Sequence, residues 1–132
     1  MRILFVADGR SPNALNWIDH WVKRGDDVHL VSTFACAPIP GIASLRFLSV
    51  AFSGLKKAGT GVASRGSSRG RWVSLRTTAR QWLGPLTLGK AARDLSGILE
   101  EVRPDLVHAL RIPYEGMLAV MANPEAPLLA SV

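Results

Sequence analysis

The sequence predicts a doubly wound α/β fold, in which helices cover both faces of a parallel sheet. Short apolar runs alternate along the chain with segments in which apolar residues recur at three- and four-residue steps, a pattern typical of alternating strands and helices. The first run, residues 2–7 (RILFVA), is almost continuous, as expected of a strand buried on both faces. With 132 residues, 48% of them hydrophobic, the chain can form one domain with its own core.

The opening of the chain predicts a strand, a helix and a second strand. After the strand at 2–7, a turn leads into the helix through Asp8, Gly9, Arg10, Ser11 and Pro12. The serine suits the N-cap, and the proline suits the first helical position. One face of this helix is apolar: Ala14, Leu15, Trp17, Ile18, Trp21 and Val22. Gly25 ends the helix, and residues 28–32 (VHLVS) form the next strand.

The middle of the chain is basic. No acidic residue occurs between Asp27 and Asp94, and the net charge of the chain is +6. A short strand is expected at 45–50, and the Gly/Ser/Arg-rich segment 58–71 is expected to be a mobile loop. A helix follows, and three arginines share one of its flanks: Arg69, Arg76 and Arg80. Such a one-signed segment either binds anions or simply forms a solvated surface.

The last part of the chain predicts two more strands and two more helices. An apolar stripe at helical spacing runs over residues 88–102, and strands are expected at 105–109 and 127–132 with a helix over 113–122 between them. We expect the strand order 3-2-1-4-5 in a three-layer α/β/α arrangement, which is a Rossmann-like sheet. Because no helix follows the last strand, we expect residues 1–132 to be one domain of a longer protein.

Ligands of doubly wound sheets bind at the carboxyl ends of the strands, near the point where the strand order reverses. Here that point lies between the first and fourth strands. The candidate binding residues are therefore those in the two loops that follow these strands: Gly9, Arg10, Ser11, Arg111 and Glu115. Glycine lets a ligand approach the backbone, and the adjacent helix N-terminus favours an anion. The first loop could equally be an ordinary tight turn with a serine cap.

His108 is the candidate catalytic residue, because we expect it to end the fourth strand beside these loops. An imidazole in that position could act as a base or bind a sugar hydroxyl. The alternative is a half-buried structural histidine bonded to a neighbouring loop. His20 and His29 are expected to be structural.

The sequence disfavours several classes of site. The dinucleotide motif G-x-G-x-x-G and the phosphate-binding P-loop are both absent, so we expect no nucleotide cofactor. One cysteine and three scattered histidines lack metal-ligand spacing, and no nucleophile elbow occurs. A single cysteine fits a reducing compartment, and the first apolar run is too short for a signal peptide. We therefore expect a cytoplasmic protein, soluble or peripheral on the inner face of the cell membrane.

Two segments resemble the family 4 glycosyltransferases of the GT-B fold. Residues 1–32 are similar to the opening of that family, with a strand, a glycine-containing loop and a helix closed by Arg-Gly. Residues 103–109 (RPDLVHA) are similar to its Pro-Asp-x-x-His signature, in the same order and at about the same spacing. The basic middle matches nothing specific. Many members carry a second histidine where this chain has Leu110.

The resemblance implies the N-terminal, acceptor-side half of a two-domain sugar-transferring enzyme that usually needs no metal. A C-terminal half would bind the nucleotide-sugar donor, and the chain alone would not catalyse transfer. Carried onto this sequence, Gly9 and Arg10 would lie beside the donor diphosphate, and His108 would face the cleft. Lipid-linked or polysaccharide acceptors are usual in this class, so the acid-free stretch from Arg46 to Arg93 would dock on anionic lipid. The contact residues would be Arg69, Arg76 and Arg80.

The residues leave two other functional classes. The first is a non-catalytic Rossmann- or flavodoxin-like module that binds a ligand or an anion. A receiver-like domain of this class is disfavoured, because Asp8 is followed by no partner or acceptor aspartate. A nucleic-acid-binding protein is disfavoured, because the arginines are not interleaved with the glycine and aromatic pattern of an RNA-binding sheet and no helix-turn-helix is present.

Overall fold

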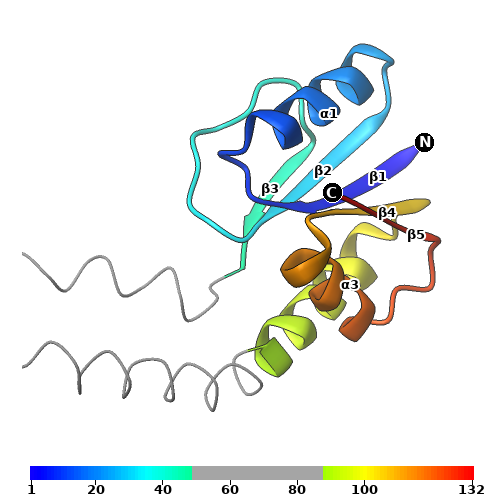
Figure 1. Cartoon of the computed structure of the whole chain (residues 1–132). Helices are drawn as coiled ribbons and strands as arrows, with labels where there is room; N and C mark the ends of the chain where they lie inside the picture. The colour runs from blue at the N-terminus through cyan, green and yellow to red at the C-terminus, as the bar shows by residue number, and fades with distance from the viewer. Residues whose placement is uncertain (49–87) are drawn as a thin grey trace, which may run out of the picture.

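The computed structural model of the chain describes residues 1–48 and 88–132 (Figure 1). Several predictions concern residues 49–87 and lie outside the described residues. These are the end of the third strand, the loop 58–71, and the helix flank with Arg69, Arg76 and Arg80. The binding of this segment to anionic lipid stays a prediction.

The described residues form a five-stranded sheet in which every strand pair is parallel. The strands are β1 (Arg2–Ala7), β2 (Asp27–Ser32), β3 (Ser44–Phe47), β4 (Leu106–Leu110) and β5 (Leu128–Ser131). Their order is β3-β2-β1-β4-β5. The predicted fold class and the predicted strand order 3-2-1-4-5 are therefore confirmed. In the register of the sheet, Ile3 of β1 lies between Val28 of β2 and Leu106 of β4.

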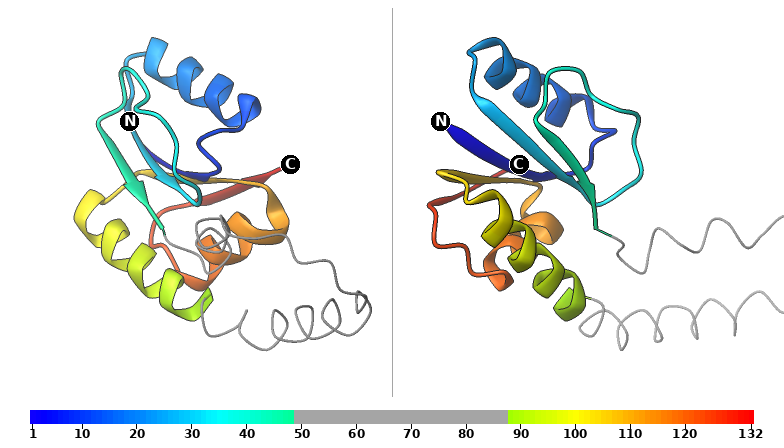
Figure 2. Two further views of the ribbon diagram at one scale, coloured as in Figure 1. Left: turned by 90° about the vertical axis from the view of Figure 1, so that its left-hand side faces the viewer. Right: turned by 180° about the vertical axis from the view of Figure 1, so that it is seen from behind.

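Helices cover both faces of the sheet, as Figure 2 shows. Helix α1 (Pro12–Lys23) lies on one face, while residues 88–102, which are helical, and α3 (Met117–Met121) lie on the other. Alternate residues of β1 face opposite sides of the sheet. Ile3 and Phe5 pack in the cluster on the α1 side, and Leu4 and Val6 pack in the cluster on the opposite side. This two-sided burial explains why the first strand reads as a continuous apolar run.

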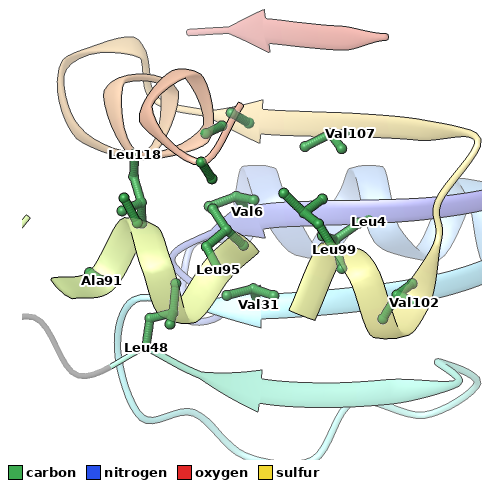
Figure 3. Packing of buried hydrophobic residues seen from close by; sticks show 14 residues of the cluster. Leu4, Val6, Val31, Leu48, Ala91, Leu95, Leu99, Val102, Val107 and Leu118 are labelled. Carbon is green, nitrogen blue, oxygen red and sulfur yellow. The ribbon is translucent and has the colours of Figure 1, made fainter. Parts of the chain in front are cut away.

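The cluster opposite α1 is formed mainly by leucine, valine and alanine side chains (Figure 3). Leu95 and Leu99 from the helix at 88–102 point toward Val6 and Leu4 of β1, and Leu118 reaches the same cluster from α3. Leu95 and Leu118 are fully buried. Burying one such side chain stabilises the fold by about 1.5–3 kcal/mol, so this layer holds the two helices on the sheet.

Helix α1 is amphipathic as predicted, although its aromatic residues are less buried than expected. Ala14 and Ile18 are buried, whereas Trp17 is 40% exposed. Gly25 has a φ of +82°, and its N–H donates to the carbonyl of Val22 at 2.9 Å. This left-handed residue ends the helix where the sequence predicts.

The segment after β4 differs from the single helix predicted over 113–122. It begins with a π-helical turn, η2 (Ile112–Gly116), in which the Gly116 N–H donates to the Arg111 carbonyl at 3.1 Å. The regular helix α3 follows only from Met117. Within residues 1–48 and 88–132, no helix has the length and apolarity needed to cross a membrane.

Candidate functional site

The carboxyl ends of β1, β2 and β4 meet at one edge of the sheet, where the strand order reverses between β1 and β4. Ligands of open α/β sheets bind at this position. We call the polar and aromatic residues gathered there the carboxyl-edge site: Asp8, Gly9, Arg10, Thr33, Phe34, Arg111 and Glu115. They come from the three loops that follow β1, β2 and β4.

Arg10 is held in place by its neighbours. Its Nε donates to Asp8 Oδ1 at 3.0 Å and its Nη2 to Asp8 Oδ2 at 2.9 Å, while its Cζ lies 4.1 Å from the centre of the Phe34 ring. The side chain is still 55% exposed. Hydrogen bonding from Arg10 lowers the pKa of Asp8, so this carboxylate stays ionised to a more acidic pH than a free aspartate does. The result is a guanidinium group with a fixed orientation at the surface.

Gly9 is required by packing against the protein itself, and its role in letting a ligand approach stays a prediction. Its N–H donates to the buried Ser32 Oγ at 3.0 Å. A Cβ on residue 9 would lie 2.6 Å from Cys36 Sγ. The loop after β2 therefore occupies the space that the missing side chain leaves.

Ser11 occupies the predicted N-cap position, with extended backbone, but its hydroxyl makes no cap hydrogen bond. Its N–H instead donates to the Asp8 carbonyl at 2.9 Å, and its own carbonyl accepts from the Leu15 N–H at 3.0 Å. The turn is thus closed by the backbone. The predicted N-cap position of Ser11 is confirmed, without a contribution from its hydroxyl.

Arg111 and Glu115 pair with each other. Arg111 Nη2 lies 2.5 Å from Glu115 Oε1, and Arg111 Nε lies 3.1 Å from Oε2. Thr33 Oγ1 donates to Glu115 Oε1 at 3.0 Å. Glu115 is fully buried, while the Arg111 side chain is 52% exposed. A carboxylate withdrawn from water in this way is tolerated only because charged and hydroxyl donors satisfy it.

The two arginines lie close enough to influence each other. The hydrogen bond to Glu115 raises the pKa of Arg111, while the positive charge of Arg10 acts in the opposite direction. The charge of Arg111 also helps to lower the pKa of Asp8. The structure therefore brings together Gly9, Arg10 and the Arg111–Glu115 pair, as the sequence predicts.

His108 lies elsewhere. The prediction that it ends its strand is wrong, because β4 continues to Leu110, which is buried and pairs with Ser131. The imidazole is only 2% exposed. Its Nε2 lies 2.9 Å from Ser131 Oγ, and its ring centre lies 5.2 Å from that of Phe5 and 5.4 Å from that of Trp17. Burial lowers its pKa, so the ring is neutral at pH 7. Its catalytic role stays a prediction.

Sequence reasoning placed Asp8 in the first loop without naming it as a binding residue, and it missed Thr33 and Phe34 as members of the site. Thr33 and Phe34 follow β2, which does not border the reversal of strand order. One signal was available, because Thr33 directly follows the run VHLVS and so had to lie at the same edge of the sheet.

This arrangement is suited to binding rather than to proton transfer. An arginine keeps its proton at every physiological pH, and both carboxylates are engaged by guanidinium groups. In the part of the chain that the structure describes, no group of three or more histidine, cysteine, aspartate or glutamate side chains is placed to hold a metal ion. What the site offers a ligand is two oriented, half-exposed cations.

No family model, no curated protein and no solved structure matches the chain. The likeness to family 4 glycosyltransferases accordingly stays a prediction from residues 1–32 and 103–109.

Proposed function

We propose that this chain is the acceptor-side domain of a GT-B-type glycosyltransferase, and that its carboxyl-edge site holds the phosphate-bearing part of a sugar substrate. The observation that carries the proposal is the pair of half-exposed guanidinium groups that follow β1 and β4, where the strand order reverses. Nucleotide sugars and lipid-linked sugars all bear phosphate, which guanidinium groups bind through paired hydrogen bonds. The sequence resemblance points to the same class of substrate.

Prior orientation of the arginines favours such binding. Arg10 is fixed by Asp8 and Phe34, and Arg111 is fixed by Glu115, so a ligand has little side-chain entropy to remove. Each carboxylate accepts only two of the guanidinium N–H donors of its arginine. The remaining donors have no partner among the described residues, and they supply the contacts for a phosphate group.

A non-catalytic anion-binding module is the second candidate, and the burial of His108 favours it. The other two histidines of the chain lie on α1 (His20) and in β2 (His29), so the carboxyl-edge site has no imidazole of its own. A module of this kind would use the same two arginines and would recognise the anion without its sugar.

Isothermal titration with inorganic pyrophosphate tests the site itself. Arg10→Gln should weaken binding about tenfold or more, because a charge-assisted hydrogen bond contributes about 1.5–3 kcal/mol. Arg24→Gln is the matched control. Arg24 is also 55% exposed, pairs with Asp26 at 3.4 Å and lies 4.5 Å from the Trp21 ring centre, but it stands at the far end of α1. Equal losses in the two variants, or no binding by the wild type, would refute the proposal.

A second titration separates the two candidate functions. A short-chain prenyl-diphosphate-linked sugar should bind more tightly than pyrophosphate if the chain is an acceptor domain, because the sugar then adds contacts of its own. Equal affinities for the two probes would support the anion-binding module instead.

A further inference from the structure

We infer that Glu115 is a positioning residue of the carboxyl-edge site, and that Thr33 anchors it so that the Arg111 guanidinium is held where it meets a phosphate group. This inference rests on the proposed function. The sequence had indicated Glu115 as a ligand contact, and it had not indicated Thr33.

The first observation is the burial of the Glu115 carboxylate. The side chain has no exposed surface, yet it receives hydrogen bonds from Arg111 and Thr33. Taking a carboxylate out of water is costly, and an apolar residue of similar volume usually serves a core as well or better. Orienting the guanidinium is a role that an apolar residue could not fulfil.

The second observation is the strained backbone that leads into this pair. Arg111 has a φ of +81°, which is uncommon for a residue with a side chain. Its N–H donates to the Ser131 carbonyl at 2.9 Å, so β5 fixes the backbone while Glu115 fixes the side chain. Strain of this kind persists only where surrounding contacts impose it, and it concentrates at ligand sites.

The third observation is the π-helical turn at Ile112–Gly116, which contains Glu115. Such a turn accommodates one residue more than an α-helical turn, and π turns are often found at functional sites. Here the glutamate lies inside the turn and pairs with the arginine four residues earlier, at the residue that caps it.

The fourth observation is that the Thr33–Glu115 hydrogen bond joins two separate loops. Thr33 follows β2 and Glu115 follows β4, and these strands flank β1 on opposite sides. The bond therefore spans the carboxyl end of β1, from which Arg10 projects. It ties the second arginine of the site to the part of the sheet that carries the first.

Titration of three variants with pyrophosphate tests the inference. Glu115→Gln should weaken binding about tenfold, because it removes the group that orients the Arg111 side chain. Thr33→Val removes only the hydroxyl donor and should weaken binding about threefold. Ser96→Ala is the matched control, because that hydroxyl donates to the Ala92 and Ala122 carbonyls, both at 3.0 Å, away from the edge. It should bind as the wild type does.

The readout is the affinity of folded protein, with the melting temperature measured in parallel. If Glu115 had only a structural role, its replacement would lower the melting temperature without changing the affinity. The same result for Thr33→Val would overturn the inference, even if Glu115→Gln did not fold. If the wild type and Arg10→Gln behave as proposed while both variants bind normally, only the inference fails. If the wild type does not bind pyrophosphate, the proposed function fails as well.

Discussion

The two edges of the sheet both carry ion pairs of arginine with a carboxylate, but these pairs differ in their burial. At the amino edge, where the strands begin, Arg2 pairs with Asp27 at 3.0 Å, and the two side chains are 46% and 45% exposed. The N-terminal ammonium group and Arg24 lie near Asp26. At the carboxyl edge, Arg111 pairs with a glutamate that has no exposed surface. Pairs of the first kind contribute about 0–1 kcal/mol each, whereas a buried charge is costly once its partner is lost.

The difference also extends to the backbone. The carboxyl edge combines a residue at positive φ with a π-helical turn and a buried carboxylate, all within Arg111–Gly116. In the segments that lead into the strands, positive φ occurs at Gly25 and Gly41, where glycine adopts it without strain, and at Arg103 and Asn123. Ion pairs at the amino edge join strand starts to one another. Those at the carboxyl edge fix the direction of arginine side chains.

The largest expected effect on stability comes from removing Arg111. Arg111→Gln leaves Glu115 buried without its cation and should lower the free energy of unfolding by about 3–5 kcal/mol. Arg24→Gln should lower it by no more than about 1 kcal/mol, because Asp26 keeps the N-terminal ammonium group at 3.0 Å and Arg24 itself is 55% exposed. Urea denaturation of both variants measures the difference. Arg111→Met combined with Glu115→Leu should recover most of the loss, and failure to recover it would contradict a loss caused by the uncompensated carboxylate.

A smaller effect is expected at Gly9. The alanine Cβ in Gly9→Ala would meet Cys36 Sγ, and overpacking of this kind costs about 1–3 kcal/mol. Gly97→Ala is the control, and it should raise the stability instead. Its Cβ would meet nothing within 4 Å, and alanine favours a helix by about 0.5–1 kcal/mol over glycine. Adding Cys36→Ala to Gly9→Ala should restore part of the loss. Equal stability of the Gly9 single and double variants would show that the thiol is not the obstacle.

The smallest effect is the pH dependence caused by His108. Its pKa is lowered by burial, so the folded state favours the neutral ring. The corresponding stability is present above the unfolded pKa of about 6.5 and is lost as the pH falls through the lower folded value, at no more than about 1.4 kcal/mol per pH unit. Chemical denaturation between about pH 7.5 and pH 5 measures this loss. His108→Gln should flatten the profile in that range, and an unchanged profile would contradict a buried, neutral imidazole.

The sequence could predict the sheet because its signals are local and repeated. Continuous apolar runs mark buried strands, and Gly25 marks the end of α1 through its backbone freedom. With those elements in place, connection rules leave few strand orders, and the observed one follows. The carboxyl ends of β1 and β4 could therefore be expected to meet.

The interior of the site could not be predicted, because it depends on contacts between distant residues. Thr33 and Glu115 are 82 positions apart, and their hydrogen bond requires the π-helical turn, which no sequence pattern indicated. The extension of β4 to Leu110 depends on pairing with β5, and it moves His108 from the strand end into the α1 layer. Local rules brought together the loops after β1 and β4, but they did not indicate the loop after β2 or the direction in which the side chains point.

The central claim is that the carboxyl edge, and not the amino edge, binds a phosphate-bearing ligand. Mapping the backbone amide shifts and the arginine Nε–H shifts by NMR during a pyrophosphate titration tests it most directly. We predict that the shifts gather at residues 9–11, 33–36 and 111–116, with the Nε signals of Arg10 and Arg111 among the largest. Shifts centred on Arg2, Arg24 and Asp27, or shifts spread evenly over the surface, would contradict the claim.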